Sequence, residues 1–528
     1  MQAKFAGIEI EITEAKSNSP ELTTSLMEEP AVKSYFEQSR YRILSTKRTG
    51  STQMETKAAR KSIPVESSQV VAYNYTKNCC VFLTSGQTEP VEIVESNLQP
   101  VPTDEEFEDA FDIIFKKSEK IHEAYKAGSV RLYKPMPPTI DTKFADGRIE
   151  RTLGVGIQSK VPEIKSEIIG VNMITHAIVH FKHGAPRQSL GGDDHCGIDD
   201  ANQKTSGQGV PGEAWISIKD GGKEIWKFMV IRPSASSGRL GSGIELKYVD
   251  YKNKRVLDQA HVPILNVAYD ENKCGPYRDW QFQEGMFEAN GKDVVSGIRI
   301  CNSKAKTILD TDNDKGNFKG VAIYVDGNEV VLVSEMEAGW YRYISEWRFH
   351  TDGTILPRFG FSAVHNNCVC NKHHHNVYWR LDFNIEGSEN NLVEEFNDPV
   401  QIGNANWHKI LYEVRRQKNA SSSRKWRISN AVSGSNYELI PGANDGLADG
   451  FGVGDFWVLT NGGEFEIDDG VYAGRGSREK CKAHIDWFAR GESVDNTDIV
   501  IWYGAHFTHD IHVEAGHIIG PTLKCVKW

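Results

Sequence analysis

The sequence has too few cysteines for a disulfide scaffold, no long apolar run and fewer basic than acidic residues, and each of these features excludes a class of protein. Nine cysteines among 528 residues are too few for a densely cross-linked secreted domain, so we expect no disulfide framework. No stretch reaches the roughly 18 uninterrupted apolar residues of a membrane-spanning helix. With 61 Lys and Arg against 72 Asp and Glu, the net charge is −11, which disfavours nucleic-acid partners.

The amino-terminal segment MQAKFAGIEIEITEAK also lacks the basic and apolar regions of a secretory signal peptide. We therefore expect a cytoplasmic protein that does not bind a membrane. The composition, 39% hydrophobic and 25% charged, is that of a globular chain, and the length suits several domains.

The patterning predicts two small domains before a large one. Residues 1–100 alternate short apolar runs with polar stretches, which indicates a small mixed α/β domain. From Thr103 the sequence shows a cap-like threonine, acidic residues in the next turn, apolar residues at helical spacing and a closing Gly128. This pattern predicts a helix or a helix pair within a second small α/β domain, residues 101–205.

The remaining residues, 206–528, read as β-structure. Short apolar or alternating runs such as WISIKD, GIELKYVD and FWVLT are bounded by Gly, Asn and Asp, and almost no long helical period occurs among them. The fold class is therefore mainly β, with one large antiparallel β-sandwich after the small α/β domains.

Metal chemistry is suggested by the HHH run at residues 373–375, which leads into the apolar stretch NVYWRLDFNI. On a strand, residues i and i+2 share a face, so the first and third histidines can reach one ion while His374 points away. The segment IWYGAHFTHDIH offers a third ligand in His506, His509 or His512. Three imidazoles favour copper or zinc; the alternative is a polar surface cluster.

The order and spacing of these motifs resemble the copper amine oxidases, which build a topaquinone cofactor from one of their own tyrosines. In that family His-x-His is followed at a fixed distance by Arg-Leu-Asp, as His373 and His375 are followed here by residues 380–382. Its third ligand lies in a Trp-Tyr…Thr-His segment, which here ends at His509. The resemblance implies copper on His373, His375 and His509, a small-molecule substrate such as an amine, and a homodimer.

The same resemblance implies a second site for a hard cation such as calcium, which prefers oxygen ligands. Its ligands by position are Asp382, the Phe383 carbonyl, Asp498 and the Ile499 carbonyl. Asn384 stands where the family often has another carboxylate, which lowers the charge of this site. The alternative for both aspartates is a solvated or salt-bridged position at a strand end.

The resemblance covers the chain in detail from Lys227 to the C-terminus. Within this stretch, Tyr341 in the segment WYRY corresponds to the topaquinone precursor. The family has Asn before this tyrosine and an acid after it, whereas this chain has Trp340 and Arg342. We expect a bulky ring and a new cation there to alter ring orientation and substrate charge preference. Ordinary aromatic strand packing is the alternative.

The family also uses a carboxylate base in Phe-Asp-x-Gly, and here Gln283 takes the aspartate position. An amide cannot remove a proton from the substrate. Glu284 is the neighbouring replacement and Asp279 a second one, with a surface acid as the alternative reading of Glu284. Tyr269 matches the tyrosine that hydrogen-bonds the quinone in the family, or else is an ordinary packed tyrosine.

Two further polar clusters have no place in this resemblance. Cys368-Val-Cys370 could be half of a metal site, but no second cysteine pair stands at zinc-site spacing, so we expect buried or exposed strand thiols there. The segment GGDDHCGIDD, residues 191–200, could bind a cation but is typical of a solvated acidic loop.

The sequence thus supports three hypotheses of function. The first is an enzyme, a copper-dependent oxidoreductase that deaminates a primary amine through topaquinone at Tyr341. The second keeps copper and the fold but leaves Tyr341 unmodified for other chemistry on a specialised metabolite. The third is a non-catalytic, metal-binding homologue, since fold alone does not fix function.

Overall fold

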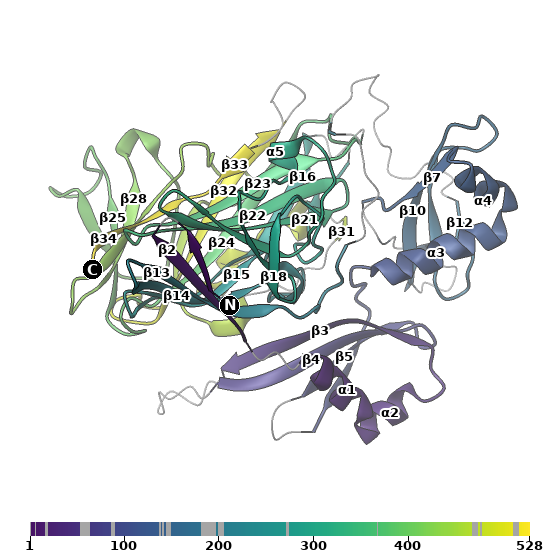
Figure 1. Cartoon of the computed structure of the whole chain (residues 1–528), viewed down its shortest axis with the longest axis horizontal. Coiled ribbons are helices and arrows are strands. Elements are labelled where there is room, and N and C mark those ends of the chain that lie inside the picture. The colour runs from purple at the N-terminus through teal and green to yellow at the C-terminus, as the bar shows by residue number, and fades with distance from the viewer. Residues whose placement is uncertain are drawn as a thin grey trace.

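The computed structural model describes most of the chain (Figure 1). The described residues are 2–5, 7–15, 19–52, 64–85, 90–136, 139, 142–143, 149–180, 197–198, 205–270, 274–366, 368–466, 474–475, 478–509 and 517–528. The polar segment at residues 191–200 lies outside them except for residues 197–198, and His512 lies outside them as well. None of the described helices is both long and apolar enough to cross a membrane.

The first small unit is a four-stranded antiparallel meander with two helices. Its helices and strands are α1 (Ser19–Glu28), α2 (Pro30–Phe36), β3 (Tyr41–Thr52), β4 (Pro64–Asn74), β5 (Cys79–Ser85) and β6 (Glu92–Ser96). The strands pair in chain order, and apolar residues of α2, β4 and β5 form a separate small core, among them Val32, Phe36 and Val81.

The second small unit begins with the helix pair. Its elements are α3 (Asp104–Lys117), α4 (Glu119–Lys126), β7 (Val130–Tyr133), β8 (Thr142–Lys143), β9 (Ile149–Glu150), β10 (Thr152–Ser159), β11 (Glu167–Asn172) and β12 (Ile178–Val179). Thr103 and Glu106 form a reciprocal capping box at the start of α3. Glu106 also forms a fully buried ion pair with Arg151, which lies between β9 and β10, and this pair ties the helix to the strands.

The rest of the chain forms a large sandwich of two sheets. The first sheet has the order β1-β2-β13-β14-β15-β16-β24-β32-β30-β27, with β17 beside β16 and β31 beside β17. Its strands are β1 (Gln2–Phe5), β2 (Ile8–Glu14), β13 (Glu213–Asp220), β14 (Lys223–Ile231), β15 (Glu245–Tyr251), β16 (Lys254–Tyr269), β17 (Tyr277–Arg278), β24 (His373–Phe383), β27 (Val414–Arg416), β30 (Phe456–Thr460), β31 (Gly474–Arg475) and β32 (Ile499–His509).

The second sheet has the order β18-β19-β20-β21-β22-β23-β34-β29-β28-β25-β26, with β33 beside β23. Its strands are β18 (Gly291–Val295), β19 (Ile298–Cys301), β20 (Val321–Asp326), β21 (Glu329–Ala338), β22 (Tyr341–His350), β23 (Ile355–Ala363), β25 (Asn391–Phe396), β26 (Trp407–Ile410), β28 (Lys425–Asn430), β29 (Asn436–Ile440), β33 (His517–Ile519) and β34 (Thr522–Lys527). The short helices around the sandwich are η1 (Pro233–Ala235), α5 (Ile308–Thr311), η3 (Ala420–Ser422), η4 (Gly463–Glu466), α6 (Arg478–Cys481) and η5 (Ile485–Phe488).

The prediction of a mainly β fold with a large antiparallel sandwich is confirmed. The structure departs from the predicted division into residues 1–100, 101–205 and 206–528 at the start of the chain, where β1 and β2 are not part of the first small unit. β2 pairs along its length with β13, for example Ile10 with Ile218, so the first strands belong to the sandwich. Ile8, Ile10 and Ile12 are buried in its core, which explains why an alternating segment so far away in sequence joins this sheet.

The core between the two sheets also sets the positions of the chemically interesting side chains. β24 lies between β16 and β32, and its first residue, His373, stands opposite Tyr269 on one side and His509 on the other. β22 belongs to the facing sheet and begins at Tyr341. Consecutive strand residues alternate in side, so every second residue of β24 faces β22.

Candidate functional site

Three histidines meet inside the sandwich at one end of β24 and β32. His373 and His375 are both 1% exposed, as expected for neighbours on the inner face. The ring centre of His373 lies 4.9 Å from that of His375 and 4.9 Å from that of His509. The structure thus brings together the three residues that we expected to bind copper.

This spacing fits a shared metal ion. A ring nitrogen bound at about 2.0–2.1 Å places its ring centre about 3.2 Å from the metal, so two rings at roughly right angles are about 4.5–5 Å apart. In the described part of the chain, no three His, Cys, Asp or Glu side chains already gather their donor atoms as a closed cation site. The chemistry of the three imidazoles suits copper or zinc.

Two of the histidines have their second ring nitrogen held by the protein. His373 Nδ1 lies 2.6 Å from the carbonyl oxygen of Asn371, so it donates and leaves Nε2 for a ligand. His375 Nδ1 lies 3.4 Å from the Tyr343 hydroxyl. Burial, followed by the neighbouring histidines, lowers the pKa of His375 well below its usual value, which keeps this ring neutral.

Tyr341 lies beside these rings. Its side chain is 2% exposed, and its ring centre lies 4.7 Å from that of His375 in an edge-on arrangement. The Tyr341 hydroxyl forms a hydrogen bond with the Tyr269 hydroxyl. Trp340 Nε1 donates to the same Tyr269 oxygen at 3.1 Å, so the replacement tryptophan belongs to this cluster.

The other replacement, Arg342, lies on the opposite side of β22. Its guanidinium forms two hydrogen bonds with the carboxylate of Asp314, at 2.7 and 2.8 Å, and lies 3.6 Å from Glu337. The arginine is 2% exposed. Its charge is compensated there, so our expectation that it would change the charge seen by a substrate is wrong.

The three candidates for a base occupy different environments. Gln283 accepts a hydrogen bond from Trp280 Nε1 at 2.7 Å. Glu284 is held by Arg232 and Ser234: its Oε1 accepts from Arg232 Nε at 2.8 Å and from Ser234 Oγ at 2.9 Å. Both oxygens of this carboxylate are engaged, Oε2 by Arg232 and Oε1 by Arg232 and Ser234, so neither is free to accept a proton from a substrate, and the structure argues against Glu284.

Asp279 has the environment of a proton acceptor. It is fully buried, and burial raises the pKa of its carboxyl to about 7. One oxygen accepts a hydrogen bond from Tyr343, while Oδ1 has no hydrogen-bond partner among the described residues. Tyr343 stands two residues after Tyr341 on β22 and lies next to His375 Nδ1. Asp279 is thus connected to His375 through Tyr343.

The expected second cation site contains more carboxylate side chains than the sequence suggested. Asp382 and Asp498 both bind the Asn461 side chain, at 3.0 and 3.4 Å. Burial raises the pKa of both carboxyls, and their mutual repulsion adds to the shift of Asp382. Asp258 of β16 bonds to Asn384, so it brings a third carboxylate next to the position where the family has one.

Our expectation of thiols at Cys368 and Cys370 is wrong. Cys274 and Cys368 form a disulfide across 94 residues, and Cys370 is also disulfide-bonded, so the Cys368-Val-Cys370 motif is not half of a metal site. Neither cysteine has an unusual local sequence. The pairing depends on two loops that meet only because β16 and β24 are neighbours, which no spacing rule reveals.

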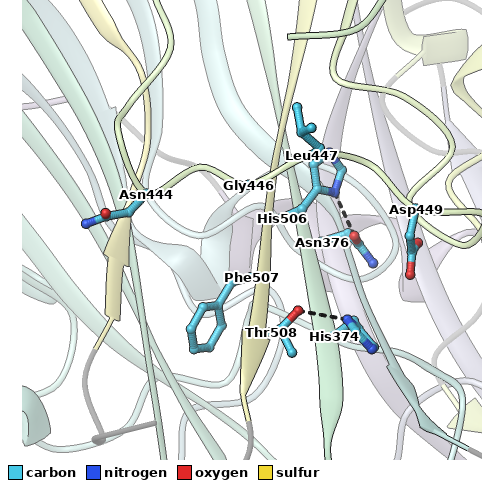
Figure 2. A pocket seen from close by; sticks show the side chains of 9 residues that line it. All are labelled: His374, Asn376, Asn444, Gly446, Leu447, Asp449, His506, Phe507 and Thr508. Carbon is cyan, nitrogen blue, oxygen red and sulfur yellow. Dashed lines mark hydrogen bonds between the residues drawn. The ribbon is translucent and has the colours of Figure 1, made fainter. Parts of the chain in front are cut away.

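The outer face of the same strands carries the histidines that do not face Tyr341. His374 contacts the Thr508 hydroxyl at 2.9 Å, and His506 contacts Asn376 Oδ1 at 2.7 Å. They line an open pocket of about 440 Å³, together with Asp449 (Figure 2). Strand alternation therefore separates His506 from His509, and His374 from its two neighbours.

Tyr343 and Asn371 are the site residues that the sequence analysis missed. Tyr343 stands two residues after Tyr341 on a strand, so their shared face was a usable signal. Asn371 acts through its backbone carbonyl, which any residue could provide, so no side-chain pattern points to it.

No family model matches this chain. It is similar to "Amine oxidase [copper-containing] gamma 1" of Arabidopsis thaliana, with 22% identity over 307 residues that cover 47% of this chain and 42% of that protein. The match thus spans less than half the length of that relative.

Solved structures of copper amine oxidases share the fold. A copper-containing benzylamine oxidase from Hansenula polymorpha has a TM-score of 0.61 at 14% identity, covering 95% of each chain. An amine oxidase from Aspergillus nidulans has a TM-score of 0.52 at 14% identity, covering 96% of this chain and 87% of that one. The chain is copper amine oxidase-like, as the motif resemblance implied.

Proposed function

We propose that this protein is a copper-dependent oxidoreductase that deaminates a primary amine, with Tyr341 as the precursor of topaquinone. The observation that carries the proposal is the buried contact of Tyr341 with His375, next to His373 and His509. When present, copper and topaquinone supply the redox chemistry that turns a primary amine into an aldehyde, ammonia and hydrogen peroxide.

The surrounding residues orient this site and keep water out. Tyr269 and Trp340 hold the hydroxyl edge of Tyr341 from one side, while Tyr343 stacks on its ring with centres 5.5 Å apart. The Asn371 carbonyl fixes the ring of His373. A fixed ring in a dry site is the condition under which a modified tyrosine reacts at one position only.

We assign the proton-accepting role to Asp279 in place of the missing aspartate at position 283. Its Oδ1 has no partner in the described part of the chain, and its pKa of about 7 suits proton transfer near neutral pH. The amide at Gln283 is held by Trp280 and keeps a structural role in the same loop.

The test is to load the metal-free protein with Cu(II) in air and to record its intact mass and visible spectrum. The proposal expects a mass gain from added oxygen net of lost hydrogens, with a chromophore that reacts with phenylhydrazine. Tyr341→Phe should show neither change, and Tyr343→Phe should still show both. Copper uptake without a mass gain in the wild-type chain would reject topaquinone.

A second candidate follows from one observation. The Tyr341 hydroxyl already contacts Tyr269, which is held in turn by a tryptophan where the family has a small amide. A tyrosine held in this way could remain unmodified while copper on the same histidines serves other chemistry on a specialised metabolite. This candidate expects stoichiometric copper and no reaction with hydrazines.

Three further properties belong to the proposal. A homodimer and an occupied calcium site at Asp382 and Asp498 remain predictions from the family resemblance. A cytoplasmic location remains a prediction from the sequence, but the disulfide between Cys274 and Cys368 favours an oxidising compartment, because cytosolic thiols are kept reduced. Peptide mass mapping of the purified protein without reductant tests the compartment argument.

A further inference from the structure

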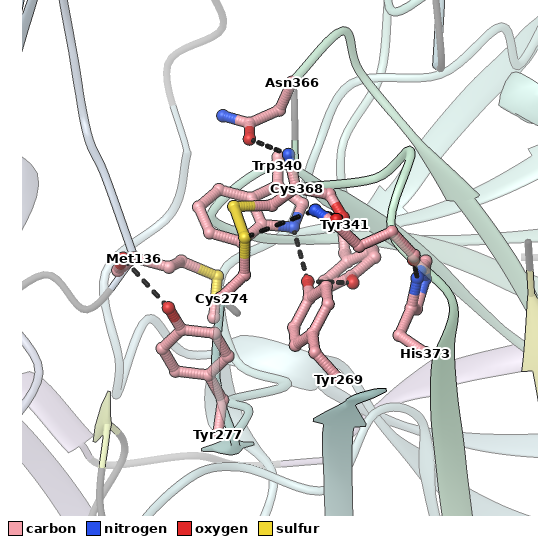
Figure 3. Close-up of a disulfide and its surroundings, with 10 residues drawn as sticks. Met136, Tyr269, Cys274, Tyr277, Trp340, Tyr341, Asn366, Cys368 and His373 are labelled. Carbon is pink, nitrogen blue, oxygen red and sulfur yellow. Dashed lines mark hydrogen bonds between the residues drawn. A yellow bond between two sulfur atoms is a disulfide. The ribbon is translucent and has the colours of Figure 1, made fainter. Parts of the chain in front are cut away.

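A disulfide closes the two strands that carry site residues at the end where the site lies. β16 ends at Tyr269 and β24 begins at His373, and these two residues stand opposite each other. Cys274 follows the first strand and Cys368 precedes the second, and their sulfur atoms are bonded (Figure 3). Cys274 is 2% and Cys368 3% exposed, so the bridge belongs to the interior.

On one side, the bridge supports the turn that orients His373. The backbone N–H of Asn371 donates to the Cys368 carbonyl at 3.1 Å, and its side-chain amide lies 3.6 Å from the sulfur of Cys274. The carbonyl of Asn371 then accepts from His373 Nδ1 at 2.6 Å. One short turn therefore joins both half-cystines to a metal-binding ring.

On the other side, the bridge holds a backbone segment against Tyr269. A Cβ atom on Gly275 would lie 2.9 Å from the ring of Tyr269 and 2.7 Å from that of Tyr277, so this peptide packs directly on both rings. The ring of Tyr277 meets that of Tyr269 edge-on at 6.1 Å. Movement of Cys274 would therefore remove the support behind Tyr269.

We propose that the Cys274–Cys368 disulfide is a positioning element of the metal site, and that its reduction by a dithiol weakens metal binding. The proposal rests on copper binding by His373, His375 and His509. In the reduction the S–S bond breaks, each sulfur takes up one electron and one proton, and the dithiol becomes a disulfide. Both loops then lose their covalent link next to Asn371 and Gly275.

The test compares Cu(II) affinity of the full-length wild-type chain and the double variant Cys274→Ser/Cys368→Ser, by competition with a chelator. Changes beyond the directly bound ligands typically cost about 10–100-fold in metal affinity, and we expect a loss in this range with an altered Cu(II) EPR spectrum. Cys525→Ser, which changes a thiol outside this bridge, should leave both readouts unchanged.

The outcomes separate this proposal from the proposed function. If the wild-type chain does not bind Cu(II), copper binding itself is rejected. If the wild-type chain binds and the folded double variant binds within twofold with the same EPR spectrum, the positioning role is overturned.

Reduction of the wild-type chain provides the same test if the double variant does not fold. The protein is treated with dithiothreitol, alkylated, desalted and titrated with Cu(II), and peptide masses identify molecules in which Cys274 and Cys368 are alkylated. Because reduction also opens the disulfide of Cys370, the same treatment is given to Cys370→Ser, in which that bridge is already absent. Weaker binding of this variant after reduction supports the proposal, whereas unchanged affinity in a fully alkylated sample overturns it.

Discussion

Tyr269 and Tyr341 meet hydroxyl to hydroxyl between the two sheets of the sandwich. This hydrogen bond joins β16 of one sheet to β22 of the other, so it depends on how the two sheets pack against each other. Burial raises the pKa of both phenols well above the usual value, which keeps both rings protonated at neutral pH. Any chemistry at Tyr341 therefore starts from a neutral phenol in a dry environment.

Removing one inner histidine should abolish copper binding. We expect His375→Ala to lower Cu(II) affinity by at least 100-fold, because one of the three proposed imidazole ligands is lost. His374→Ala is the matched control, since His374 lies on the outer face and contacts Thr508. Isothermal titration with Cu(II) measures both, and equal losses in the two variants would contradict the assignment.

Asp279 and Glu284 should respond differently to removal of their charge. Asp279→Asn keeps an acceptor for Tyr343 but removes the base, so we expect peroxide release from an amine to fall by about 100-fold or more, with copper still bound. A coupled peroxidase assay on copper-loaded protein measures it. Activity within threefold of wild type would exclude Asp279 as the base.

Glu284→Gln should instead act on stability. It leaves Arg232 buried without its counter-charge, which typically costs about 3–5 kcal/mol. Chemical denaturation measures this loss, and the activity per folded molecule should remain close to that of the wild-type chain. A variant with normal stability and no activity would reverse the roles that we give to these two acids.

The sequence predicted the inner-face pair of histidines because strand periodicity is local. His373 and His375 share a face by alternation alone, and the choice of His509 over His506 came from the family motif. The structure gives the physical reason, since His506 is turned outward to Asn376. The sandwich was likewise visible in the short apolar runs.

Contacts between segments far apart in the chain could not be predicted from local sequence patterns. The joining of β2 to β13, the disulfide between Cys274 and Cys368, and the capture of Glu284 by Arg232 all depend on which strands become neighbours. Each partner is ordinary in its own sequence context. For this reason the sequence ranked Glu284, next to Gln283, ahead of Asp279 as the candidate base, and the ion pair with Arg232 that argues against Glu284 could not be foreseen.

A calcium ion should stabilise the chain through Asp382 and Asp498. Both carboxyls have a raised pKa because they are buried and close to other acids, so a bound cation would relieve a repulsion that increases as the pH rises. We expect millimolar calcium to raise the melting temperature by a few degrees at pH 8, by simple linkage. Asp498→Asn should lose this increase. An identical increase in that variant would place the effect elsewhere.

Glu335 should make stability fall as the pH rises. It is 1% exposed on β21, one oxygen accepts from the Ile308 N–H at 2.8 Å, and burial raises the pKa of the carboxyl to about 8. Between its ordinary value and that pKa the folded chain keeps a proton that the unfolded chain releases. The unfolding free energy therefore decreases with pH over this range and levels off above it.

Glu335→Gln isolates this contribution, because an amide cannot ionise and can still accept from Ile308. We expect the decline in unfolding free energy between pH 5 and pH 9 to be smaller in the variant by on the order of 2 kcal/mol. Urea denaturation at both pH values measures the difference. The same decline in Glu335→Gln as in the wild-type chain would show that this buried carboxyl does not hold its proton in the folded state.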